Sequence, residues 1–299
     1  MIKRWVKTRA HLAILAANII YGVNYSIVKD IVPGHIKPFA LLTLRSVIGA
    51  ALFWGTSLFL PKEKVKGKDL LYIFAISFFG VVINQIAFLT GISLTSPINS
   101  SILLATNPIF AFVFAALILK EKITFLSGLG LTIGFSGVMM LILQNGTPDI
   151  SNTTFLGDFY SLINSVSWAF FTVIIKRMLE KYSPVTVMKW VFFFGMFTNI
   201  PVGHHEWSTA DWSSIPVISW LEIGFVIVFA TYLGYLLLIY GLKTVSPTVV
   251  SIYTYLQPAL AAYVATLMGQ DTVDFVMIMS AVLIFSGVYV VSKQKQAAG

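Results

Sequence analysis

Long apolar runs dominate this sequence and limit the folds that are open to it. Ten such runs lie between charged or Gly/Pro-rich breaks, and a helix of roughly 20 residues crosses a bilayer core about 30 Å thick. Hydrophobic residues make up 57% of the 299 residues and charged residues only 11%. A water-soluble globule of this size needs more charge on its surface. The sequence therefore predicts an integral membrane protein.

The predicted spans are uninterrupted apolar runs and not segments in which apolar and polar residues alternate. A membrane β-barrel would show segments of roughly ten residues in which apolar and polar positions alternate, and these runs have no such period. The first run has no small-residue cleavage site after it, so we expect it to be retained. We predict an all-α membrane protein with ten transmembrane helices, near residues 11–31, 38–60, 70–93, 97–119, 123–143, 155–175, 186–202, 218–242, 247–268 and 273–292.

The distribution of basic residues predicts the orientation. If the N-terminus lies inside, 16 of the 20 Lys and Arg residues fall in inner segments. Acidic residues, Asp158 among them, fall in or beside outer loops. The positive-inside rule thus predicts a multi-pass protein of the inner (plasma) membrane with both termini in the cytoplasm. The net charge of +8 then reflects orientation, and it gives no reason to expect nucleic acid as a partner.

The chain contains an internal duplication. Residues 91–138 and 241–288 align without a gap and match at 14 of 48 positions, where chance would give roughly four. The matches include Ser96-Pro97 with Ser246-Pro247, and Pro108 with Pro258. The two predicted repeats, residues 1–145 and 150–293, hold five spans each, so the second enters the membrane from the opposite side. Inverted repeats of this kind are typical of secondary transporters, whose substrates bind near the midplane.

Several short motifs occur in a recognisable order. They are Tyr21-Gly22-Val23-Asn24 followed by Lys29, Pro38 followed by Arg45, the segment from Gly91 to Pro108, and Lys120-Glu121-Lys122 leading to Gly134 and Gly137-Val138. This order resembles the drug/metabolite transporter (DMT) superfamily, and within it the ten-helix exporters built from two EamA-type repeats. The second half departs from the pattern, because it has Gln270-Asp271 in place of Lys120-Glu121 and no counterpart of Arg45.

The resemblance implies a function as well as an architecture. It implies a central cavity formed by helices 1 to 4 and 6 to 9, with helices 5 and 10 at the periphery. It also implies export of amino acids or similar small amphiphilic metabolites. A multidrug or toxic-compound exporter remains the alternative, and a channel is a further one, because inverted repeats also occur in channels.

Polar and aromatic side chains near the middle of the predicted spans are the candidate substrate ligands. Asn18, Tyr21 and Tyr25 share one helix face, and a shift of 147 residues pairs Tyr21 with Trp168. The alternative role for such residues is hydrogen bonding between helices. The full candidate set is Asn18, Tyr21, Tyr25, Arg45, Asn84, Gln85, Asn107, Trp168, Tyr232, Tyr235, Tyr253 and Gln257.

Arg45 is the strong charge well inside a predicted span. A charge at that depth is expensive and indicates function by default. Three interpretations stay open: Arg45 binds a substrate carboxylate, it locks an outer gate to a polar partner, or its side chain extends outward to the membrane surface.

Four prolines mark the duplicated segments. Pro97 and Pro247 follow serines that suit the N-cap, so they predict helix starts. Pro108 and Pro258 are predicted to kink the helices mid-span, which would leave the carbonyls of Leu104 and Thr254 without their usual donors. Such kinks need a partner from protein, water or ligand.

The sequence argues against an enzyme. It has no cysteine, and its four histidines form no Ser/His or HExxH arrangement at mid-span. Two adjacent residues, His204 and His205, cannot both point the same way on a helix, so we expect no metal. We expect no cofactor either. The expected partners are a small-molecule substrate and the lipid bilayer, and a monomer is the expected state.

Overall fold

The structure is a computed structural model that describes residues 2–119, 125–143 and 152–297. These residues form helices and no β-strand, which confirms the all-α prediction. Among them, seven helices are long and apolar enough to cross a membrane, and two shorter apolar helices cover Gly128–Leu143 and Phe275–Gly287. Each of the ten predicted spans coincides with one helix or with consecutive helical segments.

The helical segments follow one another with short connections. They are α1 (Ile2–Ile31), α2 (Pro38–Leu58), α3 (Gly67–Ser77), η1 (Phe78–Ile83), α4 (Asn84–Leu94), α5 (Pro97–Leu104), α6 (Asn107–Leu119), α7 (Phe125–Leu143), α8 (Thr153–Leu179), α9 (Pro184–Thr209), α10 (Val217–Phe225), η2 (Val226–Leu233), α11 (Gly234–Thr244), α12 (Pro247–Ile252), η3 (Tyr253–Tyr255), α13 (Leu256–Leu267) and α14 (Phe275–Ala297).

Some helices are longer than the predicted spans. Helix α1 begins at Ile2 rather than near residue 11, and α9 continues through Pro201 to Thr209 rather than ending near residue 202. The physical reason is that an apolar run marks only the part of a helix inside the bilayer. In α9 the helix continues despite Pro201 and Gly203, because contacts with α2 override weak helix propensity: Glu206 accepts from the backbone N–H groups of Phe39 and Ala40.

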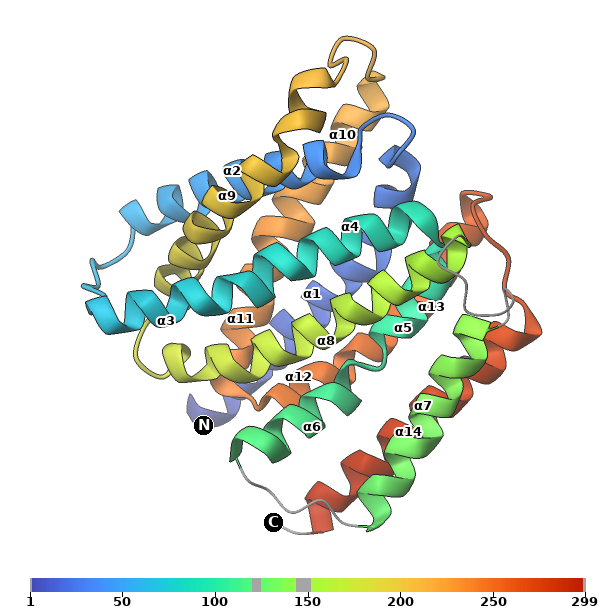
Figure 1. Cartoon of the computed structure of the whole chain (residues 1–299). Helices are drawn as coiled ribbons and strands as arrows, with labels where there is room; N and C mark the ends of the chain where they lie inside the picture. The colour runs from blue at the N-terminus through green and yellow to red at the C-terminus, as the bar shows by residue number, and fades with distance from the viewer. Residues whose placement is uncertain (1, 120–124, 144–151, 298–299) are drawn as a thin grey trace.

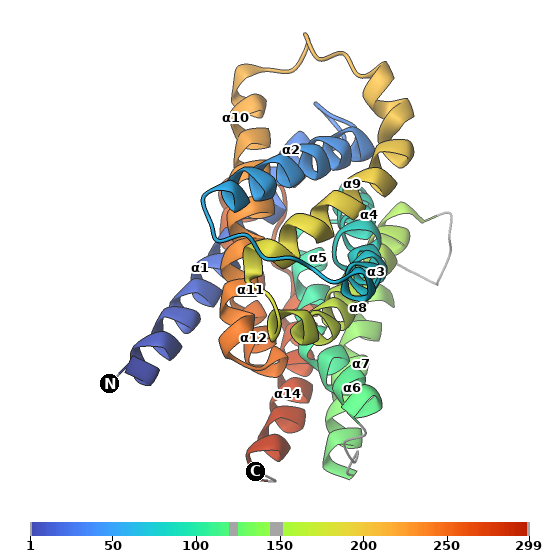
Figure 2. The same ribbon diagram turned by 90° about the vertical axis from the view of Figure 1, so that its left-hand side faces the viewer.

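Two helix pairs lie at opposite edges of the bundle. Helix α2 packs against α9 at one edge, and α7 packs against α14 at the other (Figure 1). Small residues allow the second contact, because a Cβ on Gly287 would meet the backbone of Gly130 and Gly134. Figure 2 shows the start of α1 and the end of α14 toward the end of the bundle opposite the α9–α10 connection.

The same helix contacts occur twice in the bundle. Helix α8 packs against α4 and α6, and α1 packs against α11 and α13, which are the equivalent elements of the second half. The glycines Gly91 and Gly241, which are equivalent in the two halves, also make equivalent close contacts. A Cβ on Gly91 would meet Ser161 and Gly157, and a Cβ on Gly241 would meet Ile14 and Ala10. Ile14 and Ala10 are the counterparts of Ser161 and Gly157 at the shift of 147 residues.

Two π-helical segments interrupt equivalent long helices. The segment η1 lies between α3 and α4, and η2 lies between α10 and α11. In η2 the hydroxyl of Thr231 donates to the carbonyl of Val226, five residues earlier, at 2.8 Å. Such π segments are common at functional sites. Each is followed directly by candidate ligands: Asn84 and Gln85 after η1, and Tyr235 shortly after η2.

The inner prolines break their helices rather than kink them in the middle. Helix α5 ends at Leu104 and α6 begins at Asn107, so Pro108 lies in a first turn, where its missing N–H costs nothing. Pro258 likewise lies in the first turn of α13, after the 3₁₀ turn η3. The freed carbonyl of Leu104 accepts a hydrogen bond from Ser165 Oγ at 3.4 Å. Protein, not ligand, therefore supplies this partner.

Candidate substrate cavity

A small cavity lies at the centre of the bundle, between the two halves. Its volume is about 60 Å³, which holds a few water molecules. Pockets that hold small-molecule ligands measure about 300–1,000 Å³, so this cavity is smaller than an ordinary ligand site. The lining residues are Tyr21, Asn24, Tyr25, Arg45, Asn84, Gln85, Phe88, Leu104, Asn164, Trp168, Tyr235 and Gln257.

The structure brings together most, but not all, of the candidate residues. The candidates that line the cavity are Tyr21, Tyr25, Arg45, Asn84, Gln85, Trp168, Tyr235 and Gln257. The other four are elsewhere. Asn18 lies behind Gln257, whose Nε2 donates to Asn18 Oδ1 at 2.7 Å. Asn107 Nδ2 donates to the carbonyl of Ser165 at 3.2 Å. Tyr232 contacts Thr56, and Tyr253 contacts His11.

Three rings form one wall of the cavity. Tyr21 contacts Trp168 and Tyr235 edge to face, with 6.4 Å between ring centroids in both cases. Trp168 and Tyr235 also meet edge to face at 5.2 Å. We call Tyr21, Trp168 and Tyr235 the aromatic trio. Because the rings come from α1, α8 and α11, both halves of the chain contribute to this apolar wall.

Arg45 reaches the cavity from α2 and is almost fully buried. Its Nε donates to Thr231 Oγ1 at 2.9 Å, which fixes the guanidinium against the π segment η2. The guanidinium carbon lies 5.7 Å from the centroid of the Phe88 ring. Arg45 makes no salt bridge within the described part of the chain, and its Nη1 has no hydrogen-bond partner. Arg45 therefore presents an unused charged donor.

Amide side chains form the polar part of the wall. Asn164 Nδ2 donates to the carbonyl of Asn84 at 2.9 Å, and Asn84 Nδ2 donates back to the carbonyl of Asn164 at 3.4 Å. This exchange ties α4 to α8. The hydroxyl of Tyr235 donates to the carbonyl of Gly80 at 2.9 Å, and it accepts from Gln85 Nε2 at 3.5 Å.

Five buried polar atoms of the lining residues lack a hydrogen-bond partner. Two are donors, Tyr21 OH and Arg45 Nη1, and three are amide oxygens, on Asn24, Gln85 and Gln257. Most buried polar groups in proteins are paired, so each exception needs an explanation. These atoms place both donors and acceptors at one cavity, where water or a ligand could pair them.

Sequence reasoning left four lining residues out of the candidate set: Asn24, Phe88, Leu104 and Asn164. A signal for three of them was available in the helical spacing. Asn24 follows Tyr21 by three residues, Phe88 follows Gln85 by three, and Asn164 precedes Trp168 by four, so each shares a face with a candidate. Leu104 carries no such signal, because only the helix break exposes it to the cavity.

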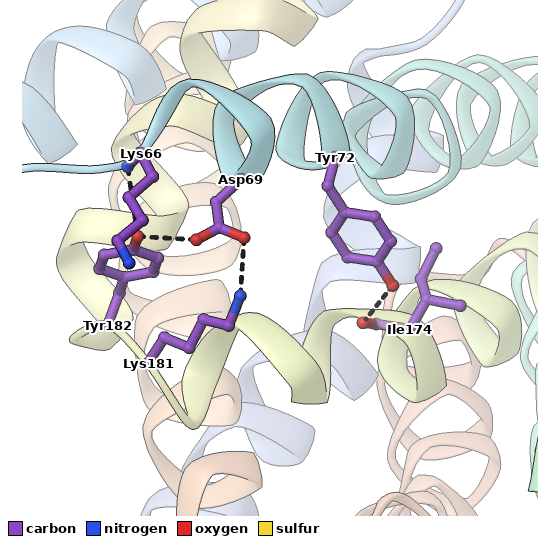
Figure 3. Close-up of polar contacts among 6 residues, drawn as sticks. All are labelled: Lys66, Asp69, Tyr72, Ile174, Lys181 and Tyr182. Atoms are coloured by element: carbon purple, nitrogen blue, oxygen red, sulfur yellow. Dashed lines mark hydrogen bonds and ion pairs between the residues drawn. The ribbon is translucent and has the colours of Figure 1, made fainter.

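Two buried carboxylates lie outside the cavity. Asp158 lies near the start of α8, beside the connection that precedes this helix, and it is fully buried because α4 and α5 cover it. Asp69 joins the start of α3 to the end of α8 by accepting from Lys181 Nζ at 2.7 Å and from Tyr182 OH at 2.9 Å (Figure 3). In the same view the hydroxyl of Tyr72 donates to the carbonyl of Ile174 at 3.0 Å. These contacts fasten α3 to α8 at one end of the bundle.

Comparisons with known proteins agree with this architecture. The chain is 25% identical over 286 residues to the uncharacterized transporter YyaM of Bacillus subtilis (strain 168), covering 94% of this chain and 93% of that protein. It is 23% identical over 295 residues to an uncharacterized transporter of Archaeoglobus fulgidus, covering 98% of this chain and 100% of that protein.

A solved crystal structure shows the same fold. It superposes with a TM-score of 0.65 at 17% identity and covers 97% of this chain and 99% of that chain. The sequence matches the EamA-like transporter family over residues 8–143 and 155–293, close to the whole chain. The resemblance to the drug/metabolite transporters is thereby confirmed, and this chain belongs to the EamA-like transporter family.

Proposed function

We propose that this transporter exports amino acids or similar small amphiphilic metabolites by alternating access between two inverted five-helix repeats. The observation that carries the proposal is the unpaired Nη1 of Arg45 at the wall of the cavity, which Tyr21 with its unpaired hydroxyl also lines. A substrate carboxylate would accept hydrogen bonds from both donors. A charge-assisted hydrogen bond of this kind contributes about 1.5–3 kcal/mol.

The rest of the cavity suits the remainder of such a molecule. The unpaired amide oxygens of Asn24, Gln85 and Gln257 would accept hydrogen bonds from an ammonium group. The aromatic trio would pack against an apolar side chain. A lipophilic cation, the usual cargo of a multidrug exporter, fits less well, because the charged side chain among the lining residues is itself a cation.

Repeated contacts support the inverted arrangement. Asn107 of α6 donates to Ser165 of α8, and Gln257 of α13 donates to Asn18 of α1. Asn18 corresponds to Ser165 at the shift of 147 residues, and Asn107 corresponds to Gln257 in the alignment of residues 91–138 with 241–288, so the two pairs are equivalent. Equivalent contacts of this kind let one half adopt the conformation of the other, which opens the opposite face of the membrane. The basic residues support an inner-membrane location with both termini in the cytoplasm.

Counterflow in proteoliposomes tests the proposal. Vesicles loaded with an unlabelled mixture of the protein amino acids should accumulate a radiolabelled trace of that mixture transiently and saturably. A carrier gives this overshoot and a channel does not. Screening the amino acids one by one then identifies the substrate. If vesicles that contain correctly inserted protein show no overshoot with any amino acid, this function is wrong.

A further inference from the structure

A row of buried polar side chains runs between α8 and the helices α5 and α6, beside the cavity. Ser100 Oγ lies 2.9 Å from Ser161 Oγ, and Thr106 Oγ1 lies 2.9 Å from Ser165 Oγ. The row begins at Asp158 and ends where Asn107 donates to the carbonyl of Ser165. We call it the polar seam, and its members are Thr95, Asn99, Ser100, Thr106 and Asn107 on one side, with Asp158, Ser161 and Ser165 on the other.

Asp158 is the titratable member of the polar seam. Thr95 Oγ1 donates to its Oδ1 at 2.5 Å, and Asn99 Nδ2 lies 3.5 Å from its Oδ2. Both partners are neutral. The elements packed around Asp158, namely α4, α5 and the described part of α7, carry no charged side chain. The nearest cation in the hydrogen-bond network is Lys29 of α1, which donates to the carbonyl of Thr95 at 2.8 Å rather than to the carboxylate.

The second half shows that the fold does not need the Asp158 end of this row. At the shift of 147 residues, Ser161 corresponds to Ile14. In the alignment of residues 91–138 with 241–288, Asn99 and Ser100 correspond to Val249 and Val250. Ile14 and Val250 belong to one hydrophobic cluster there. Asp158 itself corresponds to His11, which bonds Tyr253 instead. The Asp158 end of the polar seam is therefore a feature of one half alone, whereas its Asn107–Ser165 end has a counterpart in Gln257 and Asn18.

The surroundings of Asp158 suit a carboxyl group that changes its charge. An ionised carboxylate buried without a cation is costly, and protonation removes that cost. The neutral form would also find an acceptor, because Asn99 Oδ1 is buried and unpaired, and rotation of the amide would bring it to the new O–H. Both protonation states of Asp158 therefore have a partner available.

We propose that Asp158 binds and releases a proton during the transport cycle and so couples transport to a proton gradient; this rests on the carrier function proposed above. The proton would come from water at the membrane face where α8 begins, because Asp158 lies about 8 Å along the helix axis from that end. It would bind a carboxylate oxygen, and it would return to water when the α4–α5 connection moves away from α8. The polar seam would link this event to the helix break beside the cavity.

Two measurements on the wild-type protein separate this proposal from the carrier function. Counterflow of the radiolabelled amino-acid mixture needs no gradient and tests the carrier alone. Accumulation of the same mixture under an imposed pH gradient, with a trapped pH-sensitive dye, tests proton coupling. We expect both in the wild type. Absent counterflow would overturn the carrier, whereas counterflow without gradient-driven accumulation or proton flux would overturn the coupling.

Single substitutions then test whether Asp158 is the residue that binds the proton. Asp158→Asn should keep counterflow and lose gradient-driven accumulation and proton flux completely, while Asp158→Glu should retain both. His11→Gln, at the equivalent position of the second half, should leave coupling unchanged. Gradient-driven proton flux in Asp158→Asn would contradict the assignment. If Asp158→Asn does not fold, Ser161→Ala supplies the second test, because interruption of the polar seam should slow proton flux more than counterflow, and equal slowing would contradict the assignment.

Discussion

Lys29 and Lys176 occupy equivalent positions and make equivalent contacts at opposite ends of the bundle. Lys29 Nζ donates to the carbonyls of Ile92, Ser93 and Thr95 at 3.1, 3.4 and 2.8 Å. Lys176 Nζ donates to the carbonyls of Leu242, Lys243 and Val245 at 2.5, 3.2 and 2.9 Å. Each lysine thus satisfies the exposed carbonyls at the end of a helix, which have no donor within that helix.

Replacing Lys176 with methionine should lower the stability of the protein. The substitution removes a charged donor from three carbonyls, and hydrogen bonds to charged groups contribute about 1.5–3 kcal/mol each in favourable cases. We expect a fall of several degrees in the unfolding temperature, measured in detergent by intrinsic fluorescence. Lys64→Met is the matched control, because Lys64 is exposed in the loop before α3. Equal unfolding temperatures for the two variants would contradict the capping role.

Replacing Gly287 with alanine should disrupt the contact between α7 and α14. An added Cβ would lie 2.5 Å from Gly134 N and 2.7 Å from Gly134 Cα, and backbone atoms cannot move aside as a side chain can. We expect a lower unfolding temperature. Gly128→Ala, also in this helix pair, is the control, because no atom lies within 4 Å of its Cβ position. It should leave stability unchanged or raise it, because alanine favours helix.

The lowered pKa of Glu63 predicts how the stability of the protein changes at acidic pH. Partial burial of Glu63 acts to raise its pKa, but hydrogen bonds from Thr186 and Ser183, with Lys243 nearby, outweigh it and hold the pKa below its ordinary value of 4.5. A lowered pKa means that the native state favours the ionised form. The stabilisation is therefore complete above pH 4.5 and is lost as the pH falls through the lowered pKa.

The measurement for Glu63 is the unfolding temperature of wild type and Glu63→Gln as a function of pH. The wild type should be more stable than Glu63→Gln at neutral pH, and the difference should shrink below pH 4.5. A difference that stays constant down to pH 3 would mean that Glu63 ionisation contributes nothing.

Replacing Arg45 with methionine should weaken transport of substrates that carry a carboxylate. The variant loses the free Nη1 donor, so KM should rise roughly tenfold or more, since tenfold corresponds to about 1.4 kcal/mol. For an amino-acid methyl ester, which lacks the carboxylate, wild type and variant should have similar KM values. If the acid and the ester lose transport equally, Arg45 has a structural role and does not bind the carboxylate.

Replacing Gln257 or Asn107 with alanine should lower transport while the protein remains correctly inserted. Gln257 lines the cavity and also binds Asn18, so its loss removes a ligand and loosens α13 against α1. Asn107 lies behind the wall and ties the broken helix to Ser165, so its loss should act on the rate rather than on KM. Wild-type uptake by both variants in proteoliposomes would remove these residues from the transport mechanism.

Much of the cavity was predictable from helical spacing. Tyr21 and Tyr25 lie on one face of α1, and Tyr21 and Trp168 were paired by the repeat, so periodicity alone brought them toward the centre of the bundle. Periodicity did not distinguish residues at the wall from residues one layer behind it. Asn18 and Gln257 both carry amides at suitable depth, yet only Gln257 lines the cavity, because the helix break before α13 decides which side chain faces inward.

The sequence by itself determined the membrane class, the helix positions and the family. These depend on the length of apolar runs, on spacing and on motif order, all of which are local properties of the chain. Tertiary structure decided which polar atoms stay unpaired. Thr231 of another helix accepts from the Nε of Arg45, whereas the described residues leave its Nη1 without a partner, and Asp158 is buried because α4 and α5 cover it. Pairing and burial depend on contacts between segments far apart in the chain, which no local pattern records.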